Sequence, residues 1–153
     1  MHLLKRHIIP KIDKILEREF PIMAKLKPLI QAHINRELVV PEKYADFNLG
    51  GAVTMVAVKF GASELPHCDW LDAWSLLSIV LVLSRKGFEG ADLALPQLDG
   101  KLPIPRRAFG LARTRALCHW STPLEGDRLV LTFFVPALLV RSALINAKVA
   151  DLA

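Results

Sequence analysis

The sequence predicts a mainly β fold of the α+β class, built as a sandwich or barrel, with helices at both ends of the chain. Short apolar runs rich in β-branched residues follow one another between residues 52 and 135, with turn residues about every eight to twelve positions. Apolar residues recur at helical spacing before and after this region. The chain has 153 residues, 52% of them hydrophobic and 23% charged, which is enough for one buried core.

Two helices are expected at the start of the chain, over residues 3–19 and 22–38. Both segments place apolar residues three and four positions apart. Pro21 separates them, because the residue before a proline avoids the helical conformation. Pro28 lies inside the second segment, where it should kink the helix or end its first turn. We expect both helices to buttress a sheet.

The expected strands come next in the chain. Residues 75–84 are almost entirely apolar and should form a strand that is buried on both faces. Residues 122–127 have the composition of a hairpin-type loop. The tail over residues 137–152 has helical spacing again. The other segments expected to contain strands are 52–60, 91–100, 101–114, 116–121 and 128–135.

The composition of the chain changes at Pro41. We therefore expect residues 1–40 to form an N-terminal helical arm that packs on the core, and residues 41–153 to form the β core with its C-terminal helix. No run reaches the roughly 18 apolar residues of a membrane-spanning helix, and no signal peptide is recognised. Two cysteines are too few for a secreted disulfide framework, which favours a reducing, intracellular compartment.

The chain is mildly basic, with a net charge of +5 and a pI of about 9.5. This charge is compatible with a nucleic-acid partner but does not require one. The densest basic segment, residues 101–115, either contacts phosphates or forms a solvated edge of the sheet.

A histidine and an aspartate separated by one residue form the main chemical motif. In an extended chain alternate side chains share a face, so His67 and Asp69 should point the same way and Cys68 should point away. His119 is the other histidine of the β region and is the expected third ligand. Two imidazoles and one carboxylate form the facial triad of non-haem iron(II) oxygenases, which leaves positions open for a chelating co-substrate and dioxygen.

Arg128 follows His119 by nine residues and starts an expected strand. Along that strand Arg128, Val130, Thr132 and Phe134 should share one face. A buried guanidinium there can bind a carboxylate through two parallel hydrogen bonds. Taken alone, Arg128 could equally be a surface residue at a hairpin end, but the order of the motifs favours an oxygenase that uses 2-oxoglutarate.

Three stretches of the sequence carry a resemblance to a known family: NLGGAVTMVAVKFGASELPHCDW, ALPQLDG and LCHWSTPLEGDRLVLTFF. They resemble the TET and base-J-binding-protein group of iron(II)/2-oxoglutarate dioxygenases, and most of all its fungal, often transposon-associated branch. The resemblance covers residues 47–135. It implies a double-stranded β-helix (jelly roll), Fe(II), 2-oxoglutarate and dioxygen, and oxidation of the methyl group of 5-methylpyrimidine bases such as 5-methylcytosine in nucleic acid, with DNA favoured.

The family motif also implies a role for individual residues. His67 and Asp69 match the first two metal ligands, and His119 matches the third. Arg128 matches the arginine that binds the co-substrate. Asn48 lies in an Asn-Leu-Gly-Gly stretch that the family shares, and we expect it to form a hydrogen bond near the co-substrate. A nucleic-acid substrate implies an intracellular, nuclear location.

Two departures from the family pattern keep other functions open. About 47 residues precede Asn48, where the family has a longer helical, DNA-contacting region. Residues 106–114 replace a simpler turn and strand before the distal histidine. The chain could therefore be a catalytically inactive jelly roll that binds a metal, or a nucleic-acid-binding remnant of a mobile element.

Cysteines and tryptophans flank the proposed ligands. Cys68 and Cys118 are compatible with buried apolar cysteines or with a zinc site, although alternation turns each one away from its neighbouring histidine. If their strands pair, the two thiols should lie near each other. Trp70, Trp74 and Trp120 could stack on a flipped base or simply pack in the fold.

Overall fold

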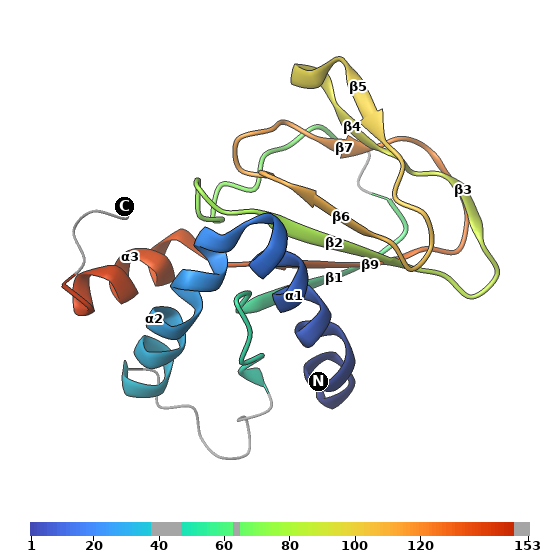
Figure 1. Cartoon of the computed structure of the whole chain (residues 1–153). Coiled ribbons are helices and arrows are strands. Elements are labelled where there is room, and N and C mark those ends of the chain that lie inside the picture. Colours follow the sequence, from blue (N-terminus) through green and yellow to red (C-terminus); the bar gives the residue numbers. More distant parts are fainter. Residues whose placement is uncertain (38–46, 63–64, 149–153) are drawn as a thin grey trace. The chain divides into compact units, whose positions relative to one another are not determined.

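The computed structural model describes residues 1–37, 47–62 and 65–148 (Figure 1). It divides into two compact units, residues 1–55 with 135–153, and residues 56–134. Helices and antiparallel sheets are both present, with helices in the N-terminal and C-terminal segments as predicted. The expected boundary at residue 41 lies outside the described residues.

The described part of the first unit contains three α-helices. A π-helical turn over Leu4–Ile8 leads into α1 (Ile9–Glu19), and α2 (Pro21–Glu37) and α3 (Ala137–Asn146) complete the set. The two N-terminal helices match the predicted segments, and Pro28 is accommodated inside α2. Helix α2 packs against both α1 and α3. The helices bury apolar residues that include Ile12, Leu16, Met23, Leu26, Ile30 and Leu144.

The position of α3 differs from the expected domain organisation. The sequence assigned this helix to the β core, whereas the structure groups it with the N-terminal helices. The reason is packing against α2, because the apolar side chains of Val140 and Ala143 are buried. A hydrogen bond also joins Asn146 to Nδ1 of His33, at 2.8 Å.

The Asn-Leu-Gly-Gly segment is anchored to the same helices. The backbone N–H of Ala52 donates to Oδ1 of Asp13 at 2.8 Å, and Gln31 donates to the carbonyl of Gly51 at 3.1 Å. A side chain at Gly51 would overlap Ile9, since a Cβ there would lie 2.4 Å from Cγ2 of that residue. The glycine is therefore required by the close approach of this segment to α1.

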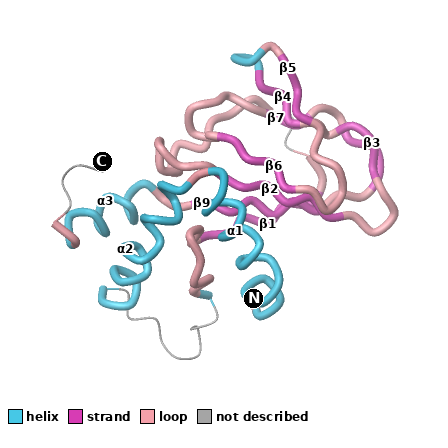
Figure 2. The backbone as a smooth tube through the Cα atoms, viewed as in Figure 1, coloured by secondary structure: helices cyan, strands magenta, loops and turns pink. Residues whose placement is uncertain are grey.

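The second unit contains the strands (Figure 2). The strands are β1 (Met55–Phe60), β2 (Ser78–Leu83), β3 (Phe88–Gly90), β4 (Leu93–Leu95), β5 (Gly100–Leu102), β6 (Phe109–Ala112), β7 (Trp120–Ser121), β8 (Leu124–Gly126) and β9 (Leu129–Phe134). A 3₁₀ turn, Pro96–Leu98, links β4 to β5. A four-stranded sheet has the order β1-β9-β2-β6, a two-stranded sheet pairs β3 with β8, and a three-stranded sheet has the order β5-β4-β7.

Strand β2 lies at the centre of the β core. It pairs antiparallel with β9 on one side and with β6 on the other, and five of its six residues are buried, as the apolar run predicted. Val80 lies opposite Thr132, and Val82 lies opposite Val130. The core cluster on this face consists of Val80, Val82, Leu93, Leu95, Ile104 and Ala112.

The interpretation of residues 122–127 as a loop is wrong. Leu124–Gly126 forms strand β8, which pairs with β3. The segment has the composition of a hairpin turn, but its backbone groups bond to a distant strand: the carbonyl of Pro123 accepts from the N–H of Ala91 at 2.9 Å.

Among the helices of the described ranges, none combines the length and apolar character needed to cross a bilayer.

We predict that Gly90 is required for the β3–β8 pairing. Its φ is +69°, and a Cβ at this position would lie 2.1 Å from the carbonyl oxygen of Pro123. Gly90→Ala should lower the free energy of unfolding by about 2–4 kcal/mol, as measured by chemical denaturation. Gly100→Ala is the matched control, because its Cβ would meet only ordinary contacts. Equal losses in the two variants would contradict this account.

Candidate metal centre

A backbone bridge brings together two histidines that are far apart in the sequence. The N–H of His67 donates to the carbonyl of His119 at 3.0 Å, and the N–H of His119 donates back to the carbonyl of His67 at 2.9 Å. These two bonds form an isolated antiparallel bridge. The centroids of the two imidazole rings are consequently 4.3 Å apart.

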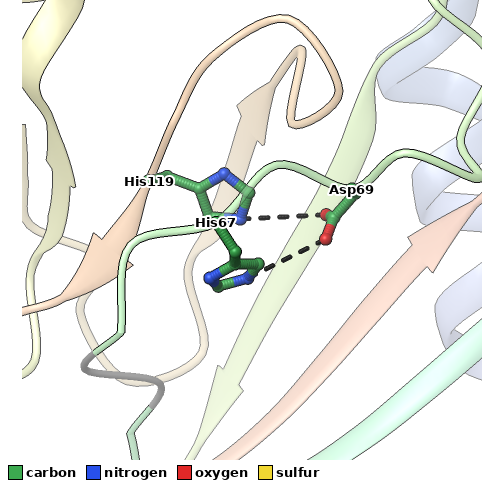
Figure 3. A group of neighbouring side chains, drawn as sticks. All are labelled: His67, Asp69 and His119. Carbon is green, nitrogen blue, oxygen red and sulfur yellow. Dashed lines mark ion pairs between the residues drawn. The ribbon is translucent and has the colours of Figure 1, made fainter.

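The carboxylate of Asp69 faces both rings, as Figure 3 shows. Its Oδ1 lies 3.8 Å from Nε2 of His67, and its Oδ2 lies 3.8 Å from Nε2 of His119. Neither distance is short enough for a hydrogen bond. One ligand atom from each of the three residues lies within 4.8 Å of the others. The structure therefore brings together all three residues that the motif singled out, with donor atoms directed at a shared space.

Both imidazoles are held in the same way through their other nitrogen. Nδ1 of His67 lies 2.8 Å from the carbonyl of Leu65, and Nδ1 of His119 lies 2.9 Å from the carbonyl of Leu117. A carbonyl can only accept, so Nδ1 carries the hydrogen in each bond. Nε2 is therefore the nitrogen that faces Asp69, and in the neutral ring it offers the lone pair that binds a metal. The donor set of two imidazoles and one carboxylate fits a divalent transition metal.

The three residues open onto a cavity of about 490 Å³ in the β unit. This volume is within the usual range for a small-molecule site. His119 is buried at 6% exposure, whereas the His67 side chain is 41% exposed, so the cluster lies at the mouth. One wall of the cavity is formed by alternate residues of β9 and the residue before it, as the expected strand periodicity predicted: Arg128, Val130, Thr132 and Phe134.

Arg128 brings a buried positive charge to this cavity. It is 6% exposed, and its Nη1 donates a long hydrogen bond, 3.4 Å, to Oγ of Ser121. Within the described residues no acceptor contacts its buried Nε. Burial lowers the pKa of Arg128, and the nearby charge of Asp92 opposes this change. A buried guanidinium with unused donors is costly, and these donors fit an anionic ligand such as a carboxylate.

A buried polar network that the sequence analysis missed supports the loop after Asp69. The carboxylate of Asp72 accepts from Ser78 at 2.6 Å and from Thr114 at 3.0 Å. Arg115 donates to the Asp72 carbonyl at 2.6 Å. Two backbone hydrogen bonds close the loop. The N–H of Asp72 donates to the carbonyl of Asp69, and the N–H of Asp69 donates to the carbonyl of Thr114, both at 3.0 Å. The network therefore fixes the backbone that carries the carboxylate ligand.

The sequence held only a weak signal for this network. Ser78 is a polar residue inside the largely apolar run of residues 75–84, and Thr114 comes two residues after another apolar segment, residues 108–112. Such residues mark buried hydrogen bonds when they face the core. Their shared partner, Asp72, could be identified only once β2 and β6 were paired.

Asn48 belongs to the helical unit. Its Oδ1 accepts a hydrogen bond from the N–H of Gly50 at 3.0 Å, which forms a turn. Gly50 has a φ of +73°, a value that suits glycine. The observed role of Asn48 is therefore to shape this segment, and its predicted contact with a co-substrate stays a prediction.

The flanking cysteines and tryptophans occupy several environments. Cys68 and Cys118 are both free and half-buried, and Cys68 contributes to the cavity wall. Neither belongs to the metal-binding cluster found among the described residues, so the cluster gives no support to a cysteine-zinc site. Trp70 is 70% exposed and lines the cavity together with Trp120, whereas Trp74 is 60% exposed.

We predict that the Asp72 carboxyl makes stability depend on pH. Desolvation by burial raises its pKa, while hydrogen bonds from Ser78 and Thr114 lower it, and the net direction is upward. A carboxyl with a raised folded-state pKa contributes stability below its unfolded pKa and loses it as pH rises through the folded value.

Asp72→Asn should therefore show a smaller fall in the free energy of unfolding between about pH 4 and pH 7 than the unchanged protein. Urea denaturation at a series of pH values measures this difference. Asp99→Asn is the control, since Asp99 is exposed. If the free energy of unfolding of Asp72→Asn changed with pH in the same way as that of the unchanged protein, the Asp72 carboxyl would not be the cause of the pH dependence.

We also predict that the three-residue cluster binds one divalent transition-metal ion. Cobalt(II) is a useful probe because its visible absorption reports coordination. Asp69→Ala and His119→Ala should each weaken binding by about 100-fold or more, since each removes a direct ligand. Glu17→Ala and His7→Ala change exposed residues of the helical unit and should bind cobalt normally. An unchanged affinity for cobalt(II) in Asp69→Ala and His119→Ala would exclude this site.

Comparison with known proteins supports the fold. No family model matches the sequence, and no curated protein matches it. Among solved structures, the chain is similar to NgTET1 in complex with 5mC DNA, with a TM-score of 0.58 and 14% sequence identity. The match covers 88% of this chain and 51% of the NgTET1 chain, so this chain spans about half the length of that structure. The chain therefore has a TET-like fold.

Proposed function

We propose that this protein is an Fe(II)/2-oxoglutarate-dependent dioxygenase that oxidises the methyl group of a 5-methylpyrimidine base in nucleic acid, with DNA favoured. One observation carries the proposal: the His67, Asp69 and His119 cluster and the buried guanidinium of Arg128 line the same cavity. A metal site alone would suit many proteins. A metal site that shares a cavity with a buried, incompletely bonded arginine suits a chelating dicarboxylate.

The cluster fits iron(II) by its donor types. His67 and His119 would each bind through Nε2, and Asp69 would bind through a carboxylate oxygen. Three protein ligands leave positions for a co-substrate and dioxygen, and the bound ion would supply the oxidative chemistry. The protein's own contribution is to hold the rings by their Nδ1 bonds and the carboxylate by the Asp72 network.

Arg128 would bind the carboxylate of 2-oxoglutarate that is far from the metal. Its buried Nε has no acceptor in the described part of the chain, and its bond to Ser121 is long, so donors are available to a ligand. Phe88 lies against the guanidinium, with its ring centroid 5.6 Å from the central carbon, and holds it in place. Arginine suits the task because its planar fork matches a carboxylate.

We further propose that the sheets are the two halves of a double-stranded β-helix. The four-stranded sheet and the smaller sheets contribute to one apolar core and line one cavity, as the two layers of a jelly roll do. The likeness to NgTET1 supports this architecture. Membership of the fungal, transposon-associated branch rests on the sequence motifs alone.

The substrate class rests on three observations. NgTET1 is described as a complex with 5mC DNA. The chain has a net charge of +5, which suits a polyanion. Trp70 is largely exposed where it lines the cavity, a position from which an indole can stack on an unpaired base. A DNA substrate would favour a nuclear location.

Succinate formation tests the proposed function. The full chain, supplied with Fe(II), 2-oxoglutarate, dioxygen and an oligonucleotide that contains 5-methylcytosine, should form succinate together with an oxidised base, both measured by mass spectrometry. His119→Ala should abolish both products, and His7→Ala should not. Cobalt binding without succinate formation would support a non-catalytic metal-binding jelly roll instead.

We predict that Arg128 sets the affinity for 2-oxoglutarate but not for the metal. Arg128→Ala should weaken 2-oxoglutarate binding about 10- to 100-fold, because a charge-assisted pair is lost, and Arg128→Lys should weaken it less. Anaerobic titration of the metal-loaded variants measures this affinity. Arg106→Ala removes an exposed arginine and serves as the control. An unchanged dissociation constant for Arg128→Ala would remove the co-substrate assignment.

A further inference from the structure

We propose that Cys68 and Cys118 form a reversible intramolecular disulfide, a modification site that links the backbone segments of the two clustered histidines. Each cysteine is the immediate neighbour of one of these histidines in the sequence. The proposal depends on the backbone register and on the two thiols. It does not depend on whether the cavity is catalytic.

The register places the two cysteines opposite each other. His67 and His119 exchange both backbone hydrogen bonds, so they form a hydrogen-bonded antiparallel pair. The next pair along, Cys68 with Cys118, is then at a non-hydrogen-bonded position, where Cα atoms are about 4.5 Å apart and side chains are closest. This separation is within the range of about 4.4–6.8 Å that disulfides require.

The side chains themselves are in contact. Desolvation raises the pKa of Cys68 most, and a charge interaction and a hydrogen bond with the Cys118 thiol raise it further, so the two thiols lie within hydrogen-bonding reach of each other. Both cysteines are free and half-buried, so a small oxidant can reach them. Two thiols that already touch need little backbone movement to form a bond.

The oxidant for this reaction is a low-molecular-weight disulfide such as oxidised glutathione. One cysteine thiolate attacks this disulfide, forms a mixed disulfide and releases one glutathione thiol. The second cysteine, deprotonated to the thiolate, attacks the protein sulfur of the mixed disulfide and releases the second glutathione as thiol. Two protein thiols are oxidised to one disulfide, and one glutathione disulfide is reduced to two thiols.

The cross-link would act on the backbone of the cluster. In the reduced protein the bridge itself consists of two backbone hydrogen bonds between His67 and His119. A covalent bond between the adjacent residues would restrain opening of that bridge. The amide hydrogens of both histidines should therefore exchange with solvent more slowly in the oxidised protein.

Peptide mapping tests the proposal. The full chain is reduced, freed of reductant, incubated with oxidised glutathione, quenched in acid and treated with N-ethylmaleimide. We expect a cross-linked peptide pair that joins Cys68 to Cys118, with concerted loss of alkylation at both residues. The yield should not depend on protein concentration, and exchange of the two histidine amides should slow by about 10-fold or more.

Single-cysteine variants provide the matched control. Cys68→Ser and Cys118→Ser should each retain glutathione as a stable mixed disulfide, because no second thiol is present to displace it. Three results would overturn the proposal: a stable glutathione adduct on the unchanged protein, cross-links only between chains, or full alkylation of both cysteines after exposure to excess oxidised glutathione. The unchanged protein alone decides between these results if a variant does not fold.

Discussion

The candidate site depends on the pair of backbone hydrogen bonds between His67 and His119. These bonds join two segments that lie about fifty residues apart in the sequence and bring their imidazoles side by side. The same register sets Cys68 against Cys118. Without the bridge, Asp69 would face a single imidazole, and the donor set would be too small for a metal.

Buried polar contacts behind the bridge make the arrangement rigid. Asp72 bonds to Ser78 in β2 and to Thr114, two residues after the end of β6, and its backbone closes the loop that begins at Asp69. A satisfied network in a low-dielectric interior resists displacement, because opening it would leave polar groups unpaired. The backbone that carries Asp69, a candidate metal ligand, is therefore held by groups outside the three-residue cluster. Ligand geometry and fold stability share the same contacts here.

Much of the fold and of the cluster could be predicted from local pattern. The apolar run around β2 and the alternation along β9 gave the correct burial and the correct cavity face, because both depend on the period of a strand. Strand β8, the location of α3 and the role of Asp72 could not be predicted in this way. Each depends on a partner that is distant in the sequence, and local composition carries no information about such a partner. The shared face of His67 and Asp69 was predictable, while their meeting with His119 required the motif order.

The anchoring of both imidazoles through Nδ1 bears on the charge balance of the cavity. It leaves Nε2 of each neutral ring as an uncharged donor, so Asp69 supplies the single negative charge of the donor set. With a divalent cation in place, the donor set would carry one net positive charge. The Arg128 guanidinium would add a second positive charge at the same cavity, partly offset by the nearby charge of Asp92. Such a space favours an anion over a neutral molecule of the same size. Charge would thus favour an anionic ligand before shape does.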